Sequence, residues 1–420
     1  MNFKKVLATI LSALMITSCV SFVANAEAEL FEEAEHIAAY REAGYDIVYV
    51  SDKVSEDGTG ETPDSPRKFT EMHEVLNAVV TEDSKVVIAI DGRISSSWSI
   101  PNPVNGADVI LTSATGANGT DGGYITVYNR KATPEMRVAM FGKGESTYTF
   151  DNIHIELMDN QQNPIYAAGS DVTLTSTVTT NSVSKGLVVA HGRNATEEFT
   201  GGTIEIDTDA YIVRAGCGDG SNITGDVNYV IGENASIYYL YAGAHSNGTL
   251  DGSANVEIDG GTVTQLIPGY KAKVTGDIIV NINGGEVETL KTNLESGDGK
   301  LLGDYVIYLN DGTIGKAEKF ASGGAVSGKT VLVVNENNAV APEDGIELIP
   351  YVVSYTGDGE VEYDTANDKL VLTIGDTALT AKVTTENGLK VYNEDFAPRG
   401  RRNNNRVLRR QQDTFNSRIC

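Results

Sequence analysis

The residues of this sequence that could perform chemistry are few, and most of them lie in the middle of the chain. Arg193 and Arg214 are cationic side chains of the kind that removes a proton in a β-elimination, and Asp207 and Asp209 stand near them in sequence. Such acids could hold Ca²⁺, which neutralises a uronate and acidifies the carbon that loses its proton. A lyase is therefore one interpretation of this segment. Exposed strand and turn residues would give the same pattern.

A hydrolase is the second enzymatic interpretation of this segment. Asp207-Thr208-Asp209 places two carboxylates at positions i and i+2, which share one face of a strand. Paired carboxylates are the machinery of glycoside hydrolysis. His191-Gly192-Arg193 resembles the Gly-His-Gly element of polygalacturonase-like enzymes, but the remaining acidic motifs of that family are missing from this sequence.

Four tyrosines are the candidate ligand-binding residues: Tyr238, Tyr239, Tyr241 and Tyr270. Exposed tyrosine rings can stack on sugar rings, whereas inward rings would belong to a core ladder. Because side chains alternate along a strand, we expect Tyr238 and Tyr239 to point to opposite faces, which leaves one of them outward.

Calcium is the one ion that the sequence favours, and no cofactor is required. Asp219 and Asp226 in acidic turns are the candidate ligands, although solvated turn acids would look the same. The five histidines show no His-x-x-x-His spacing, and the cysteines form no zinc pattern.

A repeat of about 25 residues indicates the element that carries these side chains. Runs beginning at residues 225, 252, 276, 303 and 328 share one pattern, as in GSANVEIDGGTV and GDIIVNINGGEV. This period is typical of a solenoid with three strands in each coil. A β-sandwich lacks such a period, and a propeller blade needs about 40 residues. The expected body, residues 86–340, would hold about ten coils.

Within the repeat, equivalent residues should stack from coil to coil. We expect a polar ladder along one strand end and an apolar ladder inside, with glycine pairs such as Gly260-Gly261 supplying turns of positive φ. The polar ladder is Asp259, Asn283, Asn310 and Asn335, and the apolar ladder includes Val256, Ile279, Val306 and Val331.

The segments before and after the body suggest caps. Residues 28–43 have helical apolar spacing and should cover one end, 46–50 are a strand, and FTEMHEVLNAVV is a second short helix. Residues 27–85 thus form an N-terminal cap and lead-in segment. Residues 341–398 are alternating strands of a small C-terminal β cap or module.

This order of elements resembles the pectate-lyase-like superfamily. The resemblance covers roughly residues 46–340 and rests on VVIAIDGRISS, VILTSATGANGTDGGYI, STYTFDNIHIEL and the Gly-Gly-Thr repeats. It implies an all-β fold, a right-handed parallel β-helix with short N-terminal capping helices. The nearest likeness is to adhesin-like surface proteins of Gram-positive anaerobic bacteria, and this superfamily includes lyases, hydrolases and non-catalytic adhesins.

The N-terminus predicts export. Two lysines precede an apolar run, and Ala24 and Ala26 stand at the −3 and −1 positions of a cleavage site, so residues 1–26 form a signal peptide. An uncleaved membrane anchor is the alternative, and Ile16-Thr17-Ser18-Cys19 resembles a lipobox that would attach lipid to Cys19. We therefore expect a secreted or cell-surface protein.

Composition limits the partners. The formal net charge is −26, and such a surface repels nucleic acid and anionic membranes. The tail at residues 399–420 is rich in arginine and is either a disordered basic segment or a truncation or frameshift artefact. The oligomeric state is not predicted.

Together these features favour a non-catalytic, adhesin-like β-helix that presents a long face to an extracellular polysaccharide or surface partner. The alternative is a polysaccharide lyase or related carbohydrate-active enzyme. A structural spacer is a third class.

Overall fold

The computed structural model describes residues 33–96, 102–115, 122–127, 145–157, 163–181, 186–192, 198–215 and 221–356, and short strands between 359 and 391. The predicted signal peptide (1–26) and the Arg-rich tail (399–420) lie outside the described residues. Among the described residues, no helix has the length and apolar character needed to cross a bilayer.

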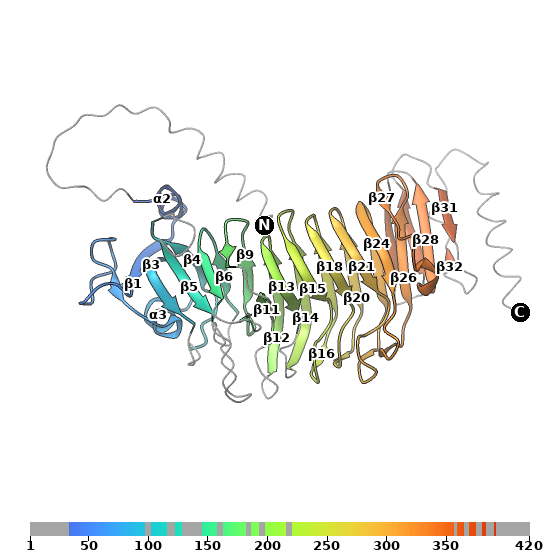
Figure 1. Ribbon diagram of the computed structural model, residues 1–420, viewed down its shortest axis with the longest axis horizontal. Helices are drawn as coiled ribbons and strands as arrows, with labels where there is room; N and C mark the ends of the chain where they lie inside the picture. Colours follow the sequence, from blue (N-terminus) through green and yellow to red (C-terminus); the bar gives the residue numbers. More distant parts are fainter. Residues whose placement is uncertain are drawn as a thin grey trace, which may run out of the picture.

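The protein is an all-β parallel β-helix in which the coils lie side by side along a rod (Figure 1). Sheet A runs the length of the rod with every neighbouring pair parallel. Its strands are, in spatial order, β1 (Asp46–Ser51), β3 (Lys85–Ser95), β4 (Asp108–Ser113), β6 (Thr147–Phe150), β9 (Asp171–Leu174), β12 (Glu198–Ile206), β14 (Asn222–Ile231), β17 (Ala254–Ile258), β20 (Ile278–Ile282), β23 (Tyr305–Leu309), β26 (Thr330–Asn335) and β28 (Tyr351–Thr356).

Sheet C forms a second side and has eight strands, one per coil. These are β8 (Asn163–Tyr166), β11 (Leu187–Ala190), β13 (Asp209–Arg214), β15 (Ser236–Tyr241), β18 (Thr262–Ile267), β21 (Glu286–Lys291), β24 (Gly312–Glu318) and β27 (Ala339–Val340).

The third side changes along the rod. In the first coils it is sheet B, which follows sheet A in the chain and contains residues 92–95 of β3, β5 (Gly123–Val127), β7 (His154–Leu157) and β10 (Thr179–Thr180). In later coils it is sheet D, which precedes sheet A and contains the first residues of β12 and β14, β16 (Thr249–Asp251), β19 (Lys273–Val274), β22 (Lys300–Leu301) and β25 (Ala325–Val326).

The repeat predicted from the sequence is confirmed in register. Val227 pairs with Ala254, Ala254 with Ile278, Ile278 with Tyr305 and Tyr305 with Thr330, which are the spacings of the repeat starts. The turn glycines also behave as expected, since Gly261 has φ 69° and Gly285 has φ 74°.

The polar ladder forms over three coils. The Asn283 side-chain amide donates to Asp259 at 3.0 Å, and Asn310 donates to Asn283 at 3.0 Å. Asn335 is in register with them, but its Oδ1 accepts the backbone N–H of Asn337 at 3.1 Å. Asn335 therefore closes its own turn.

The expected apolar ladder is wrong for three of its four residues. Val256 is in the core, but its partner in the next coil is Val280 and not Ile279. Ile279, Val306 and Val331 pair with one another on the outer face of sheet A. The expected ladder is displaced by one residue along each of these three strands. The strands are apolar on both faces, so the alternation of apolar and polar residues does not show which face is buried.

Two helices lie at the N-terminal end. Helix α3 (Met72–Val79) buries Met72, Val75 and Leu76 against the core and covers the open end of the first coil. Helix α2 (Glu35–Glu42) instead packs Ile37 against Tyr49 and Ala89 on the outer face of sheet A, so it covers the side of the first coils and not the end. The short strand β2 (Arg67–Lys68) pairs with β1.

At the C-terminal end the parallel stack continues through β28, beyond the expected boundary at residue 340. The next strands pair differently. β31 (Thr380–Val383) is antiparallel to β28, and β29 (Gly359–Asp364), β30 (Lys369–Ile374) and β32 (Lys390–Val391) form a separate small sheet.

Candidate functional site

Sheet C has an irregularity that turns two adjacent side chains outward in each coil. One residue of every strand from β13 to β24 is skipped in the pairing register: Tyr211, Tyr238, Thr264, Glu288 and Gly315. In β15 both Ile237 and Leu240 belong to the core, so the two residues between them project outward. The expectation that either Tyr238 or Tyr239 points inward is therefore wrong, because the strand bends where strict alternation was assumed.

These strands place an aromatic face on the outside of the rod, made of Tyr211, Tyr238, Tyr239, Tyr241 and Tyr270. Tyr211 and Tyr238, one coil apart, are stacked with ring centroids 5.4 Å apart and planes inclined by 16°. Tyr239 packs edge-on against both rings, at 5.6 Å from Tyr211 and 4.5 Å from Tyr238. Tyr238 is the most exposed member, at 44%.

The inner edge of the aromatic face is polar and well packed. The Tyr241 hydroxyl donates to Glu295 Oε2 at 2.6 Å, across two coils. The His245 ring lies between two tyrosines, 4.7 Å from Tyr241 and 5.0 Å from Tyr270. Lys271 Nζ lies 5.5 Å from the Tyr270 ring. The structure therefore brings all four predicted tyrosines onto one face, where Tyr241 and Tyr270 pack against His245.

Two phenols of this face, Tyr239 and Tyr241, have raised pKa values and keep their protons at physiological pH. Burial, followed by the neighbouring phenols Tyr238 and Tyr211, raises the pKa of Tyr239 to about 12. Burial and the hydrogen bond to Glu295 raise the pKa of Tyr241 still further above its ordinary value. Neutral hydroxyl groups keep their protons and can donate hydrogen bonds to a ligand.

Arg214 cannot approach a substrate in this structure. Its side chain is 1% exposed, and Nη1 donates to His245 Nδ1 at 3.4 Å beneath the aromatic face. Asp209 begins the same strand, five residues away, which at 3.3 Å per residue is roughly 16 Å. The base and the acid of the expected lyase site therefore lie at opposite ends of β13.

The two aspartates of the expected hydrolase pair do not share a strand. β12 ends at Ile206 and β13 begins at Asp209, so Asp207 lies in the corner between two sheets. Its carboxylate accepts hydrogen bonds from the backbone N–H of Asn234 at 2.8 Å and from the Asn234 amide at 3.1 Å. Asp207 thus joins one coil to the next.

Asp226 has a similar structural role. Its Oδ1 accepts the backbone N–H of Ser253 at 2.8 Å, and Asp277 and Asp304 repeat this contact in later coils. No group of three or more His, Cys, Asp or Glu side chains within the described ranges is arranged to hold a metal ion. Arg193, Asp219, Cys19, Ala24 and Ala26 lie outside those ranges.

A second polar row lies on the outer side of sheet B, where Arg93, Tyr124 and His154 are in register and Thr126 pairs with Glu156. Arg93 Nε donates to the Thr126 hydroxyl at 3.0 Å, and that hydroxyl donates to Glu156 Oε2 at 3.0 Å. Burial lowers the pKa of His154, and the Glu156 carboxylate partly offsets this.

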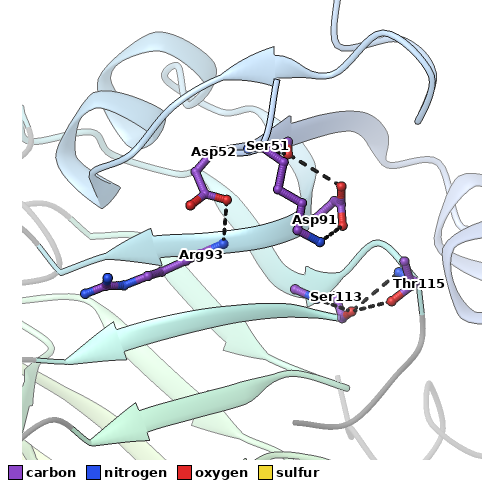
Figure 2. Close-up of polar contacts among 8 residues, drawn as sticks. Ser51, Asp52, Asp91, Arg93, Ser113 and Thr115 are labelled. Atoms are coloured by element: carbon purple, nitrogen blue, oxygen red, sulfur yellow. Dashed lines mark hydrogen bonds and ion pairs between the residues drawn. The ribbon is translucent and has the colours of Figure 1, made fainter. Parts of the chain in front are cut away.

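The backbone at Arg93 is held from the side by β1. Figure 2 shows the Asp52 carboxylate accepting the Arg93 backbone N–H, at 2.9 Å, while the guanidinium extends away along the strand. Beside it Lys53 Nζ pairs with Asp91 at 2.8 Å. The Asp52 contact therefore holds the backbone at Arg93, and the hydrogen bond from Nε to Thr126 directs the guanidinium along sheet B.

The sequence interpretation missed several of these residues. Tyr211 completes the ring stack and lies 27 residues before Tyr238, one period of the repeat, so extending the repeat by one coil would have found it. His245 and Glu295 come from turns, and no sequence pattern places them beside Tyr241. Arg93, Thr126 and Glu156 gave only a weak signal, a polar residue at alternate positions of three short strands.

Comparison with protein-family models found no match, and neither curated proteins nor solved structures gave a similar chain. The structure confirms the parallel β-helix that the resemblance implied, whereas the pectate-lyase-like superfamily itself stays a prediction.

Proposed function

We propose that this protein is an exported, surface-associated β-helix that binds an extracellular glycan with the aromatic face of sheet C. The observation that carries the proposal is the exposed tyrosine stack on adjacent coils, Tyr211 and Tyr238, with Tyr239 beside it. Aromatic rings with one apolar face and a hydroxyl at the rim suit a sugar, which combines C–H faces with hydroxyl edges.

Rigidity supports this role. The rings are carried by strands hydrogen-bonded on both sides, so little conformational freedom is lost when a ligand docks. Export is part of the proposal and rests on the signal peptide predicted for residues 1–26.

Replacement of Tyr238 tests the proposal. With an array of soluble glycans, the mature protein should bind one or more oligosaccharides, and Tyr238→Ala should weaken that binding by about tenfold or more. The reason is that the most exposed ring of the stack is lost while the core residues Ile237 and Leu240 are kept.

Tyr351→Ala is the matched control, because Tyr351 is a partly exposed strand tyrosine on sheet A, outside the aromatic face. It should bind as the wild type does. A wild-type protein that binds no glycan, or a Tyr238→Ala variant that binds normally, would contradict the proposed function.

The row on sheet B favours a second candidate function, a carbohydrate-active enzyme such as a polysaccharide lyase. Guanidinium, hydroxyl, carboxylate and imidazole groups on one outer face could move a proton. Incubation with polygalacturonate and Ca²⁺ would reveal unsaturated product by ultraviolet absorbance. Sustained product that is lost in Glu156→Gln would establish this function, and absence of product with a panel of acidic polysaccharides would reject it.

A further inference from the structure

The tyrosine stack on sheet C stops after two rings, although the column that carries it continues. Tyr238 lies opposite Tyr211 on one side and opposite Thr264 on the other, since Ile237 pairs with Val263 and Tyr239 with Gln265. The same pairing places Glu288 after Thr264. The column therefore runs Tyr211, Tyr238, Thr264, Glu288.

One face of the Tyr238 ring is covered by Tyr211, and within the described part of the chain no second aromatic ring stacks on the other face. The centroid distances among Tyr211, Tyr238 and Tyr239 are 5.4, 5.6 and 4.5 Å, which form a nearly equilateral triangle. Tyr239 therefore lies beside the stacked pair and not at its end. The far face of Tyr238 looks along the rod over the short side chain of Thr264, in agreement with its 44% exposure.

The spacing of the coils sets the length of the column that the short Thr264 side chain leaves between Tyr238 and Glu288. Successive coils are about 4.8 Å apart, so Tyr238 and Glu288 are separated by roughly 9.6 Å along the column. A ring placed midway would sit in stacking distance of Tyr238, as Tyr211 does on the opposite face. Thr264 and Gln265, both partly exposed, supply a hydroxyl and an amide at the floor.

The charges around this gap are negative. Glu288 and Glu286 are exposed on the strand that closes it. The nearest lysine of the following strand, Lys316, forms an ion pair with Glu318 at 2.7 Å and has only a weaker electrostatic interaction with Glu288. Lys291 binds the Glu318 carboxylate as well, at 2.5 Å. These two lysines hold the pKa of Glu318 down at about 2. A ring bearing a carboxylate would meet repulsion here, whereas a protonated amine would meet Glu288 and the Tyr238 ring face.

We propose that the gap above Thr264 is a slot for one pyranose ring of an amino sugar within a glycan chain, stacked on Tyr238 and paired with Glu288. The inference rests on the proposed glycan-binding function and names its ligand class. The negative charge of the whole chain, −26, favours approach of the same cationic glycans.

A larger side chain at position 264 tests the proposal, because it would occupy the slot. Thr264→Tyr should add a third ring to the stack, keep or raise the melting temperature, and weaken binding of a glucosamine hexasaccharide at pH 6 by at least tenfold. Thr264→Ser, which leaves the slot open, should bind as the wild type does. Glu288→Gln should lower the affinity for the glucosamine hexamer severalfold and leave that for the N-acetylglucosamine hexamer unchanged, as measured by calorimetry.

Each other outcome has a distinct meaning. If Thr264→Tyr binds normally while Tyr238→Ala does not, the slot is rejected and the glycan-binding function stands. If the wild type prefers an oligogalacturonate, or if Glu288→Gln does not change the preference, the amino-sugar assignment is overturned. If the wild type binds none of the three oligosaccharides or any other glycan, the proposed function itself fails.

Discussion

His191 directly follows Ala190, the last residue of β11, which pairs with Tyr166 and Arg214 in the neighbouring strands. The His191 side chain points into the interior. Its ring is fully buried, with its centroid 5.3 Å from that of Tyr229, and neither ring nitrogen has a hydrogen-bond partner among the described residues. Burial lowers the pKa of His191 to about 3. The imidazole is therefore a neutral core side chain and not a proton donor for catalysis.

This burial predicts a pH dependence of stability. The pKa is about 3 in the folded protein and about 6.5 in the unfolded chain, so as the pH falls below 6.5 the unfolded chain binds the proton first. The free energy of unfolding should therefore fall, by about 1.4 kcal/mol between pH 7.5 and 5.5. Urea unfolding of the wild type and of His191→Leu would measure this, and the variant should lack that part of the slope.

The control for this experiment is Val189→Ala, which alters a buried core residue of β11 that carries no titratable group. It should keep the wild-type slope. Equal slopes for the wild type and His191→Leu would mean that the imidazole accepts a proton in the folded protein.

At the scale of the element, the outer face of sheet A changes character along the rod. One outer column runs Glu257, Asn281, Tyr308, Val333 and Val353 in successive coils. Its first members are solvated, but Val333 is 1% exposed although it points away from the core. The outer face of sheet A is therefore buried at its C-terminal end.

Val333→Asp tests whether this face is a second packed layer. A charge at this buried position lacks a partner, so the free energy of unfolding should fall by about 3 kcal/mol or more. Asn281→Asp, two coils earlier in the same column, should change it by less than about 0.5 kcal/mol. Chemical denaturation of both variants would decide, and equal small effects would show that the Val333 side is open to solvent.

At the scale of the whole molecule, the coils form one continuous core closed at its first end by α3 and flanked there by α2. The coils form a rod (Figure 1). This shape matters for function because it places equivalent side chains at a fixed spacing, which brings Tyr211 and Tyr238 of adjacent coils into a stack. A glycan chain is built of repeating sugar units, and such a ligand suits a protein surface on which side chains recur at a regular spacing.

The sequence by itself determined the period, the parallel β-helix, the turn glycines and the polar ladder from Asp259 to Asn310. These follow from local chemistry that recurs in every coil, and recurrence is visible in a sequence. It also indicated that Tyr238, Tyr239, Tyr241 and Tyr270 belong together.

Only the tertiary structure decided which face each side chain occupies. Val306 and Val331 lie outside because both faces of their strands are apolar, so alternation could not set the direction. Tyr238 and Tyr239 both face outward because the strand bends between Ile237 and Leu240. Arg214 is buried, and its guanidinium contacts His245 in the turn of the next coil. Bends and turn packing depend on contacts between coils, and no local pattern in the sequence encodes them.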